Sequence, residues 1–151
     1  MNKKPNFSVK TPEDSPGLLL WQTTTLWQRA IKKALQPYDL SHTQFVIMAV
    51  TLWFTETQQE TTQVNIANQS KLDNMTISQS LKKLTAKGLI DRQESQKDTR
   101  AKIVMLTAKG KKLIEQIVPI VEQTDADFFG AINHNGQQSL LKLFRDRKSV
   151  V

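Results

Sequence analysis

The chain has 151 residues, a length that suits one domain with helical extensions and a core of its own. It contains no cysteine, which excludes disulfides, thiolate metal sites and a cysteine redox sensor. No apolar run approaches the roughly 20 residues of a membrane span, and residues 1–16 lack the apolar segment of a signal peptide. We therefore expect a cytoplasmic protein with no membrane attachment.

The net charge of +7 is concentrated in one stretch of the chain. Residues 71–112 contain eleven basic and four acidic residues, so the remainder is neutral on balance. Concentrated positive charge attracts polyanions, above all nucleic acid. A solvated, lysine-rich surface explains the charge equally well, so charge alone does not decide between the two interpretations.

The first third of the chain predicts an arm followed by two helices. Residues 1–16 are polar and proline-rich, which indicates a flexible or extended arm. Apolar residues recur at helical spacing over 17–35, before Pro37. Residues 41–44 (Ser-His-Thr-Gln) have the pattern of a capping box and precede an apolar helix over about 43–54. That helix is apolar on most faces, so we expect it to be buried on several sides.

The middle of the chain predicts two helices and a β-hairpin. A short helix over about 63–69 is followed by one that Asp73 or Asn74 caps, which runs to about Lys87 and ends at Gly88. Residues 89–94 and 101–106 then read as two strands joined by a polar loop. This order is that of a winged helix-turn-helix. The expected fold is mainly α with a small β-hairpin wing.

The last third predicts helices again. Thr107 is placed to cap a helix that Pro119 should kink. Residues 133–136 suggest a turn, and 137–145 a final helix with an apolar stripe.

The helix after Asp73 would be the one that enters the major groove. With Ile77, Leu81 and Leu84 buried, the helical period turns another set outward: Met75, Gln79, Lys82, Lys83 and Ala86. Thr76 and Ser78 flank this face, where Gln79 suits adenine and hydroxyls suit several base edges. Lys82, Lys83 and Lys87 suit phosphates. Each residue alone is equally well read as ordinary surface, but their combination at this point of the motif favours DNA.

Several local motifs resemble the MarR (multiple antibiotic resistance regulator) family. They are residues 72–78, residues 84–90, the wing segment Arg92…Lys97-Asp98-Thr99-Arg100, residues 106–110 (Leu-Thr-Ala-Lys-Gly) and the pair Ile66-Ala67. The resemblance extends from about Leu18 to Phe144. It implies that Arg100 enters the minor groove and that Asp98 orients it. A salt bridge that only stabilises the turn is the alternative reading of that pair.

Two departures bear on which operator is read. The family often has arginine at the position of Gln79 and an aliphatic residue at that of Ser80. The resemblance thus implies double-stranded DNA as the partner but leaves the operator sequence open.

The resemblance also implies a homodimer that binds a pseudo-palindromic operator. Residues 17–36 and 107–147 would supply the dimerisation helices, and residues 37–106 the DNA-binding lobe. The terminal segments carry more apolar surface than one small winged domain needs, although an intramolecular helical core would also use it.

The resemblance also implies repression that is relieved by a small, often aromatic or phenolic, anion or drug. The implied pocket lies near the first two helices, where the residues to inspect are Trp21, Trp27, His42, Trp53 and Phe54. Aromatic residues in such a region are more often core than ligand contacts.

Two other classes of function are conceivable for this sequence. An enzyme is disfavoured, because His42 and His134 are the only histidines and no phosphate-binding loop, metal-spaced cluster or nucleophile motif occurs. We therefore expect no catalytic residues, metal or cofactor. A winged domain that binds a protein or RNA partner is the remaining alternative, since fold does not fix function.

Overall fold

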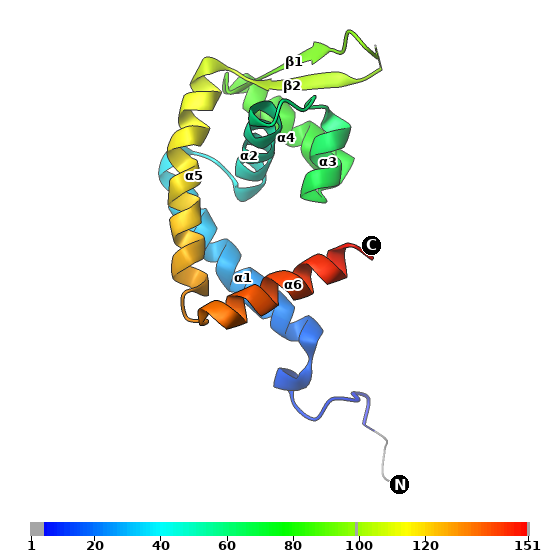
Figure 1. The fold of residues 1–151 in the computed structure, drawn as a ribbon, viewed down its shortest axis with the longest axis vertical. Coiled ribbons are helices and arrows are strands. Elements are labelled where there is room, and N and C mark those ends of the chain that lie inside the picture. The colour runs from blue at the N-terminus through cyan, green and yellow to red at the C-terminus, as the bar shows by residue number, and fades with distance from the viewer. Residues whose placement is uncertain (1–4, 99, 151) are drawn as a thin grey trace.

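The computed structural model describes residues 5–98 and 100–150, which form six α-helices and one antiparallel two-stranded sheet (Figure 1). The elements are α1 (Pro16–Leu35), α2 (His42–Glu56), α3 (Gln63–Ser70), α4 (Asn74–Ala86), β1 (Ile90–Glu94), β2 (Lys102–Leu106), α5 (Ala108–Phe129) and α6 (His134–Lys148). The predicted fold, mainly α with a β-hairpin wing, is confirmed. The first four residues of the predicted arm, and Thr99 of the wing, lie outside the described residues.

Every one of these six α-helices begins with a side chain that accepts a backbone N–H, which explains why the local signals were readable. The predicted caps Ser41, Asp73 and Thr107 are confirmed, and Ser41 forms the full capping box with Gln44. The turn predicted at 133–136 is wrong, because the Asn133 side chain accepts from the Gly136 amide at 2.7 Å and starts α6 at His134. An Asn cap can thus begin a helix whose first turn contains weak helix formers.

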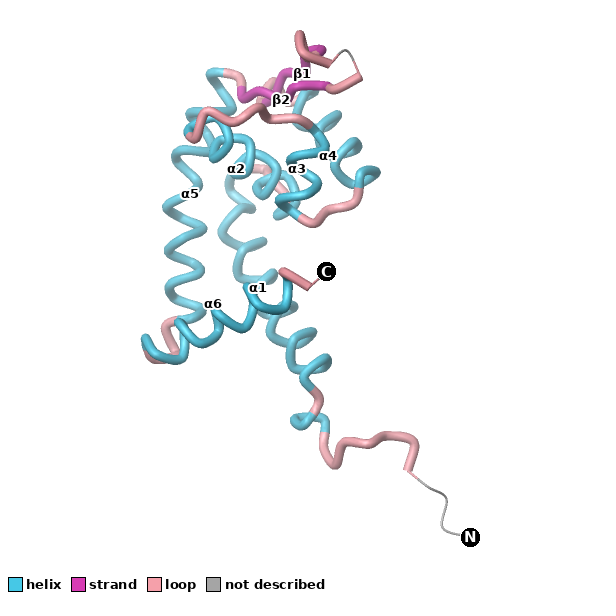
Figure 2. Tube along the Cα trace, turned by 45° about the vertical axis from the view of Figure 1, so that its right-hand side comes forward, coloured by secondary structure: helices cyan, strands magenta, loops and turns pink. Residues whose placement is uncertain are grey.

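The arm before α1 contains one turn of 3₁₀ helix, Pro12–Asp14, and α1 starts directly behind it at Pro16. Helix α5 runs without interruption through Pro119. In Figure 2 the described part of the arm, residues 5–15, extends away from the rest of the molecule.

One hydrophobic core joins α1 to the winged lobe. Ile31 and Leu35 at the end of α1 are fully buried together with residues of α2, α4, both strands and α5. Helix α1 packs along α5, while α2, α3, α4 and the hairpin gather at one end of this pair (Figure 1). The other end is different, since the first half of α1 and all of α6 contain no buried residue.

The hairpin pairs Ile90 with Leu106 at its base and Glu94 with Lys102 toward its tip. Thr62, just before α3, forms an isolated bridge with Ile103 of β2. This bridge connects the wing to the helix-turn-helix and fixes their relative position.

Candidate nucleic-acid interface

The start of α4 is fixed by Asp73. Its carboxylate accepts the Thr76 amide N–H at 2.8 Å and the Thr76 hydroxyl at 2.7 Å. These hydrogen bonds hold the pKa of Asp73 below its ordinary value, and the bond from the Thr76 hydroxyl has the larger effect. The Thr76 hydroxyl has therefore already donated its proton and is left as an acceptor, which suits an amino group on a base edge.

The two faces of α4 lie as the helical period predicts. Ile77, Leu81 and Leu84 are fully buried, whereas the outward set is exposed: Met75, Gln79, Lys82, Lys83 and Ala86. Thr76 and Ser78 are half-buried at the edge of this face. The result is an exposed strip with an amide, two ammonium groups and one large apolar side chain.

The wing loop is organised around Ser95, which sequence reasoning missed. This buried hydroxyl accepts the amide N–H groups of Lys97 and Asp98, at 3.2 and 3.3 Å, and donates to the Glu60 carboxylate at 2.9 Å. Serine commonly binds backbone amides two or three residues ahead in tight turns, and that tendency was the available signal.

Asp98 acts on the backbone of the wing. Its carboxylate accepts the Arg100 amide N–H at 3.0 Å, and the Arg100 side chain is exposed. Among residues 5–98 and 100–150 the structure contains no ion pair between Asp98 and Arg100. Asp98 thus shapes the loop that carries Arg100 and leaves the guanidinium available.

The turn that ends α4 is packed against the start of α5. Gly88 has a φ of 69°, a left-handed conformation that glycine adopts readily. Its carbonyl accepts the Thr107 hydroxyl at 2.6 Å, and the Lys87 carbonyl accepts the Lys109 ammonium at 3.2 Å. At Gly110 an added Cβ would lie 1.9 Å from the Leu89 carbonyl oxygen. The Leu-Thr-Ala-Lys-Gly segment therefore packs directly against the turn that ends α4.

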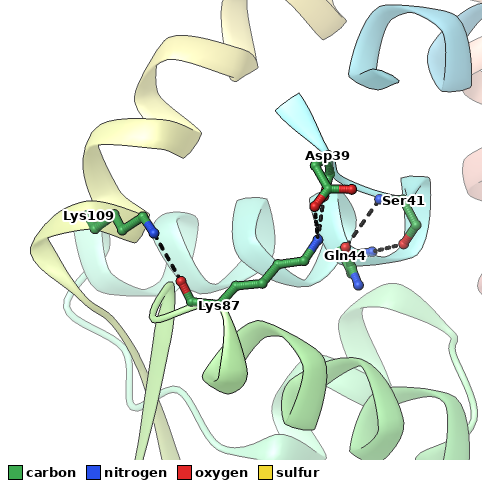
Figure 3. A network of polar contacts seen from close by, with 5 residues as sticks. All are labelled: Asp39, Ser41, Gln44, Lys87 and Lys109. Carbon is green, nitrogen blue, oxygen red and sulfur yellow. Dashed lines mark hydrogen bonds and ion pairs between the residues drawn. The ribbon is translucent and has the colours of Figure 1, made fainter. Parts of the chain in front are cut away.

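Lys87, which caps the end of α4, lies differently from Lys82 and Lys83 within the helix. Its ammonium reaches back to Asp39, between α1 and α2, where it lies 3.3 Å from the carboxylate and also donates to the Asp39 carbonyl (Figure 3). Lys87 was predicted to face phosphates together with Lys82 and Lys83. The structure engages it elsewhere, because the last turn of α4 passes close to this junction.

A cavity of about 930 Å³ adjoins this contact. It lies between the second half of α1, the first turn of α2 and the end of α4. Its charged lining residues are Arg29, Lys32, Lys33, Asp39 and Lys87. Four basic groups against one carboxylate make this cavity attractive to an anion.

Two of the five predicted pocket residues line this cavity. Trp27 and His42 meet edge to face with ring centroids 5.0 Å apart, and the Trp27 indole N–H donates to Asp125 of α5 at 2.7 Å. Burial lowers the pKa of His42, and the negative charge of Asp125 offsets part of that shift.

The other three predicted pocket residues lie elsewhere. Trp21 lines a separate depression of about 300 Å³ on the first half of α1. Trp53 is exposed and Phe54 is buried, both at the far end of α2. The α2 residues that line the cavity lie between His42 and Val46. At 1.5 Å per residue, Trp53 lies roughly 16 Å further along the helix than His42.

None of the helices in the described ranges is both long and apolar enough to cross a membrane. The same residues contain no group of three or more histidine and acidic side chains arranged to hold a metal ion.

The exposed strip of α4 and its neighbouring wing define a winged helix-turn-helix protein of the DNA-binding type. Residues 36–123 match the family described as ArnR1-like, winged-helix domain. The chain is 37% identical over 136 residues to the uncharacterized HTH-type transcriptional regulator YdcH of Bacillus subtilis, covering 87% of this chain and 92% of YdcH. The chain belongs to the MarR family of transcription regulators.

Solved structures of this family share the fold. BpsR of Bordetella bronchiseptica, whose DNA binding is described as regulated by 6-hydroxynicotinic acid, superposes with a TM-score of 0.82 at 22% identity. The match covers 96% of this chain and 98% of BpsR. The C80S mutant of MarR from E. coli, complexed with operator DNA, gives a TM-score of 0.78 at 21% identity, with 92% and 98% covered.

Proposed function

We propose that the exposed strip of α4 reads an operator in the major groove while Arg100 enters the adjacent minor groove. The observation that carries this proposal is the exposure of Gln79, Lys82 and Lys83 on a helix whose opposite face is fully buried. Gln79, Thr76 and Ser78 then meet base edges, and the two lysines meet phosphates. A guanidinium on an exposed wing suits a narrow, electronegative minor groove.

The protein acts in this proposal as a homodimer. The supporting observation is the apolar surface left open on two terminal helices: Leu19, Leu20, Trp21 and Leu26 of α1, and Leu141, Leu143 and Phe144 of α6. Two copies would present their α4 helices to successive major grooves, with half-sites about 34–36 Å apart. The operator would then be a pseudo-palindrome.

The proposed regulation is repression relieved by an aromatic anion in the cavity beside Trp27 and His42. The aromatic pair and the four surrounding basic groups support this ligand class. A ligand that prefers a spacing of the two lobes unsuited to DNA weakens operator binding by that preference. The compound named for BpsR, 6-hydroxynicotinic acid, is the first probe. Quenching of Trp27 fluorescence, in a variant that carries Trp21→Phe and Trp53→Phe, reports binding.

Fluorescence anisotropy with DNA from the region upstream of its own gene, against a scrambled duplex, tests DNA reading. We expect Arg100→Ala to weaken operator binding at least about fivefold, the smallest loss typical of a specific DNA contact. Lys10→Ala removes one positive charge from the exposed arm before α1 and serves as the control. Weak binding that is equal for both duplexes and unaffected by Arg100→Ala would contradict the proposal and favour a protein or RNA partner.

A further inference from the structure

The end of α4 is attached to the rest of the protein by two different elements. On one side the first turn of α5 holds the backbone carbonyls of Lys87 and Gly88. On the other side Asp39 holds the Lys87 ammonium (Figure 3). Lys87, the residue that directly follows α4, is thus contacted by both elements.

We propose that Lys87 is a positioning residue for operator binding, which acts through Asp39 and does not touch DNA. This inference rests on the proposed reading of DNA by α4. Lys87 is half-buried, while Lys82 and Lys83 are exposed and, within the described part of the chain, belong to no ion pair. Asp39 is well suited to its part, because it has a left-handed backbone (φ 52°) that turns its carbonyl and its carboxylate to the same ammonium.

The same contact connects the cavity to the DNA-reading helix. Asp39 and Lys87 both line the cavity, and the other charged lining groups are basic. An anion that enters it lies next to Lys87 and competes with Asp39 for the ammonium. The contact that fixes the end of α4 is therefore also one that a cavity anion would weaken, which gives the proposed regulation a physical route in this chain.

The alternative role for Lys87 is a direct phosphate contact, and the two roles predict opposite effects of Asp39→Asn. If Lys87 binds phosphate, Asp39 is its competitor, and removing that negative charge leaves operator affinity unchanged or raises it. If Lys87 positions α4, the same change weakens binding. The Asp39 side chain is 97% exposed, so the substitution threatens the fold little.

The experiment is a double-mutant cycle in anisotropy, on a duplex selected from a random pool by the wild-type protein. We expect Asp39→Asn and Lys87→Met each to raise the Kd about three- to fivefold, as loss of one partly exposed ion pair would. The double variant should be no weaker than either single variant. Lys87→Arg, which keeps the charge, should bind within about twofold of wild type.

The salt dependence of operator affinity gives a second way to tell whether Lys87 positions α4 or contacts a phosphate. Lys82→Met should lower the slope of log K against log salt by about 1, because a phosphate contact is lost. Lys87→Met should leave that slope unchanged. Circular dichroism melts verify that all variants remain folded.

Tighter or unchanged binding by Asp39→Asn, additive effects in the double variant, or a reduced slope in Lys87→Met would each overturn the inference and leave operator binding intact. If no duplex can be selected at all, the proposed function itself fails, and the inference with it.

Discussion

Helices α4 and α6 have similar amphipathic sequences and opposite surroundings. In α4, of 13 residues, Ile77, Leu81 and Leu84 are fully buried. In α6, of 15 residues, no residue is buried, and Leu143 and Phe144 are 64% and 48% exposed. The comparison teaches that helical periodicity reveals an apolar face without revealing what covers it.

The difference divides the molecule into a closed half and an open half. The winged lobe buries most of its large apolar residues in one core, which α2, α5 and the hairpin cover. The first half of α1 and all of α6 leave theirs uncovered, and extended apolar patches of this kind mark interaction sites. This contrast supports the proposed dimer, and variants in the closed half and in the open half can test it.

The largest expected effect is on the closed half. Leu81→Ala should lower the free energy of unfolding by about 3 kcal/mol, since it leaves a cavity in a fully packed site. Urea unfolding should show the same loss at every protein concentration. Leu143→Ala, at the lowest usable concentration, should cost less than about 0.5 kcal/mol. Equal losses for the two variants would erase the distinction between the halves.

The second prediction concerns the open half. Leu143→Asp places a charge on the exposed apolar face of α6 and should raise the Kd of the dimer at least about tenfold, a cost of about 1.4 kcal/mol. Sedimentation equilibrium at micromolar concentration would show a shift toward monomer.

Val64→Asp is the matched control for this change. Val64 is 61% exposed, but it lies on α3 in the closed half, so its sedimentation should equal that of wild type. A dimer that survives Leu143→Asp unchanged would remove α6 from the interface.

The elements were predictable from sequence because their signals are local. The caps Ser41, Asp73 and Thr107 each act within three residues, and the buried stripe of α4 follows from spacing alone. The start of α6 was misread because Gly136 resembles a turn residue, whereas here its amide serves the Asn133 cap. Local patterns fail where one residue serves two kinds of structure equally well.

The site was less predictable because it depends on contacts between distant segments. The exposure of Gln79, Lys82 and Lys83 is confirmed, and their contact with DNA stays a prediction. The direction of Lys87 could not be inferred, since Asp39 lies 48 residues earlier. The cavity forms where the start of α2 meets the second half of α1, so it includes His42 and not Trp53, and this contact between helices is not readable from local sequence.

The third prediction tests the contact between α1 and α5, the two long helices that pack along each other. Trp27 joins α1 to α5 through its hydrogen bond to Asp125, at 2.7 Å. Trp27→Phe leaves this carboxylate without its donor and should cost about 1–2 kcal/mol in urea unfolding. Trp21→Phe, at a 72% exposed tryptophan of the same helix, should cost less than about 0.5 kcal/mol. If the two variants are equally stable, the hydrogen bond between Trp27 and Asp125 contributes nothing to the free energy of unfolding.

The smallest expected effect on stability concerns His42, whose ring packs edge to face against Trp27. Because burial lowers its pKa in the folded protein, the unfolded chain binds a proton at a higher pH. Stability is therefore fully present above the unfolded value of about 6.5 and declines as the pH falls through and below it. His42→Gln should lack this part of the decline between pH 7.5 and 5.5, measured by urea unfolding.

His134→Gln provides the control, because His134 is exposed at the first position of α6 in the open half. It should retain the decline of the wild type. Two features surround the His42 ring: the Trp27 indole packed edge to face against it and the cavity wall around it. A decline that survives His42→Gln would mean that neither feature excludes water well enough to matter. The edge of the cavity would then be as open to water as the exposed surface around His134.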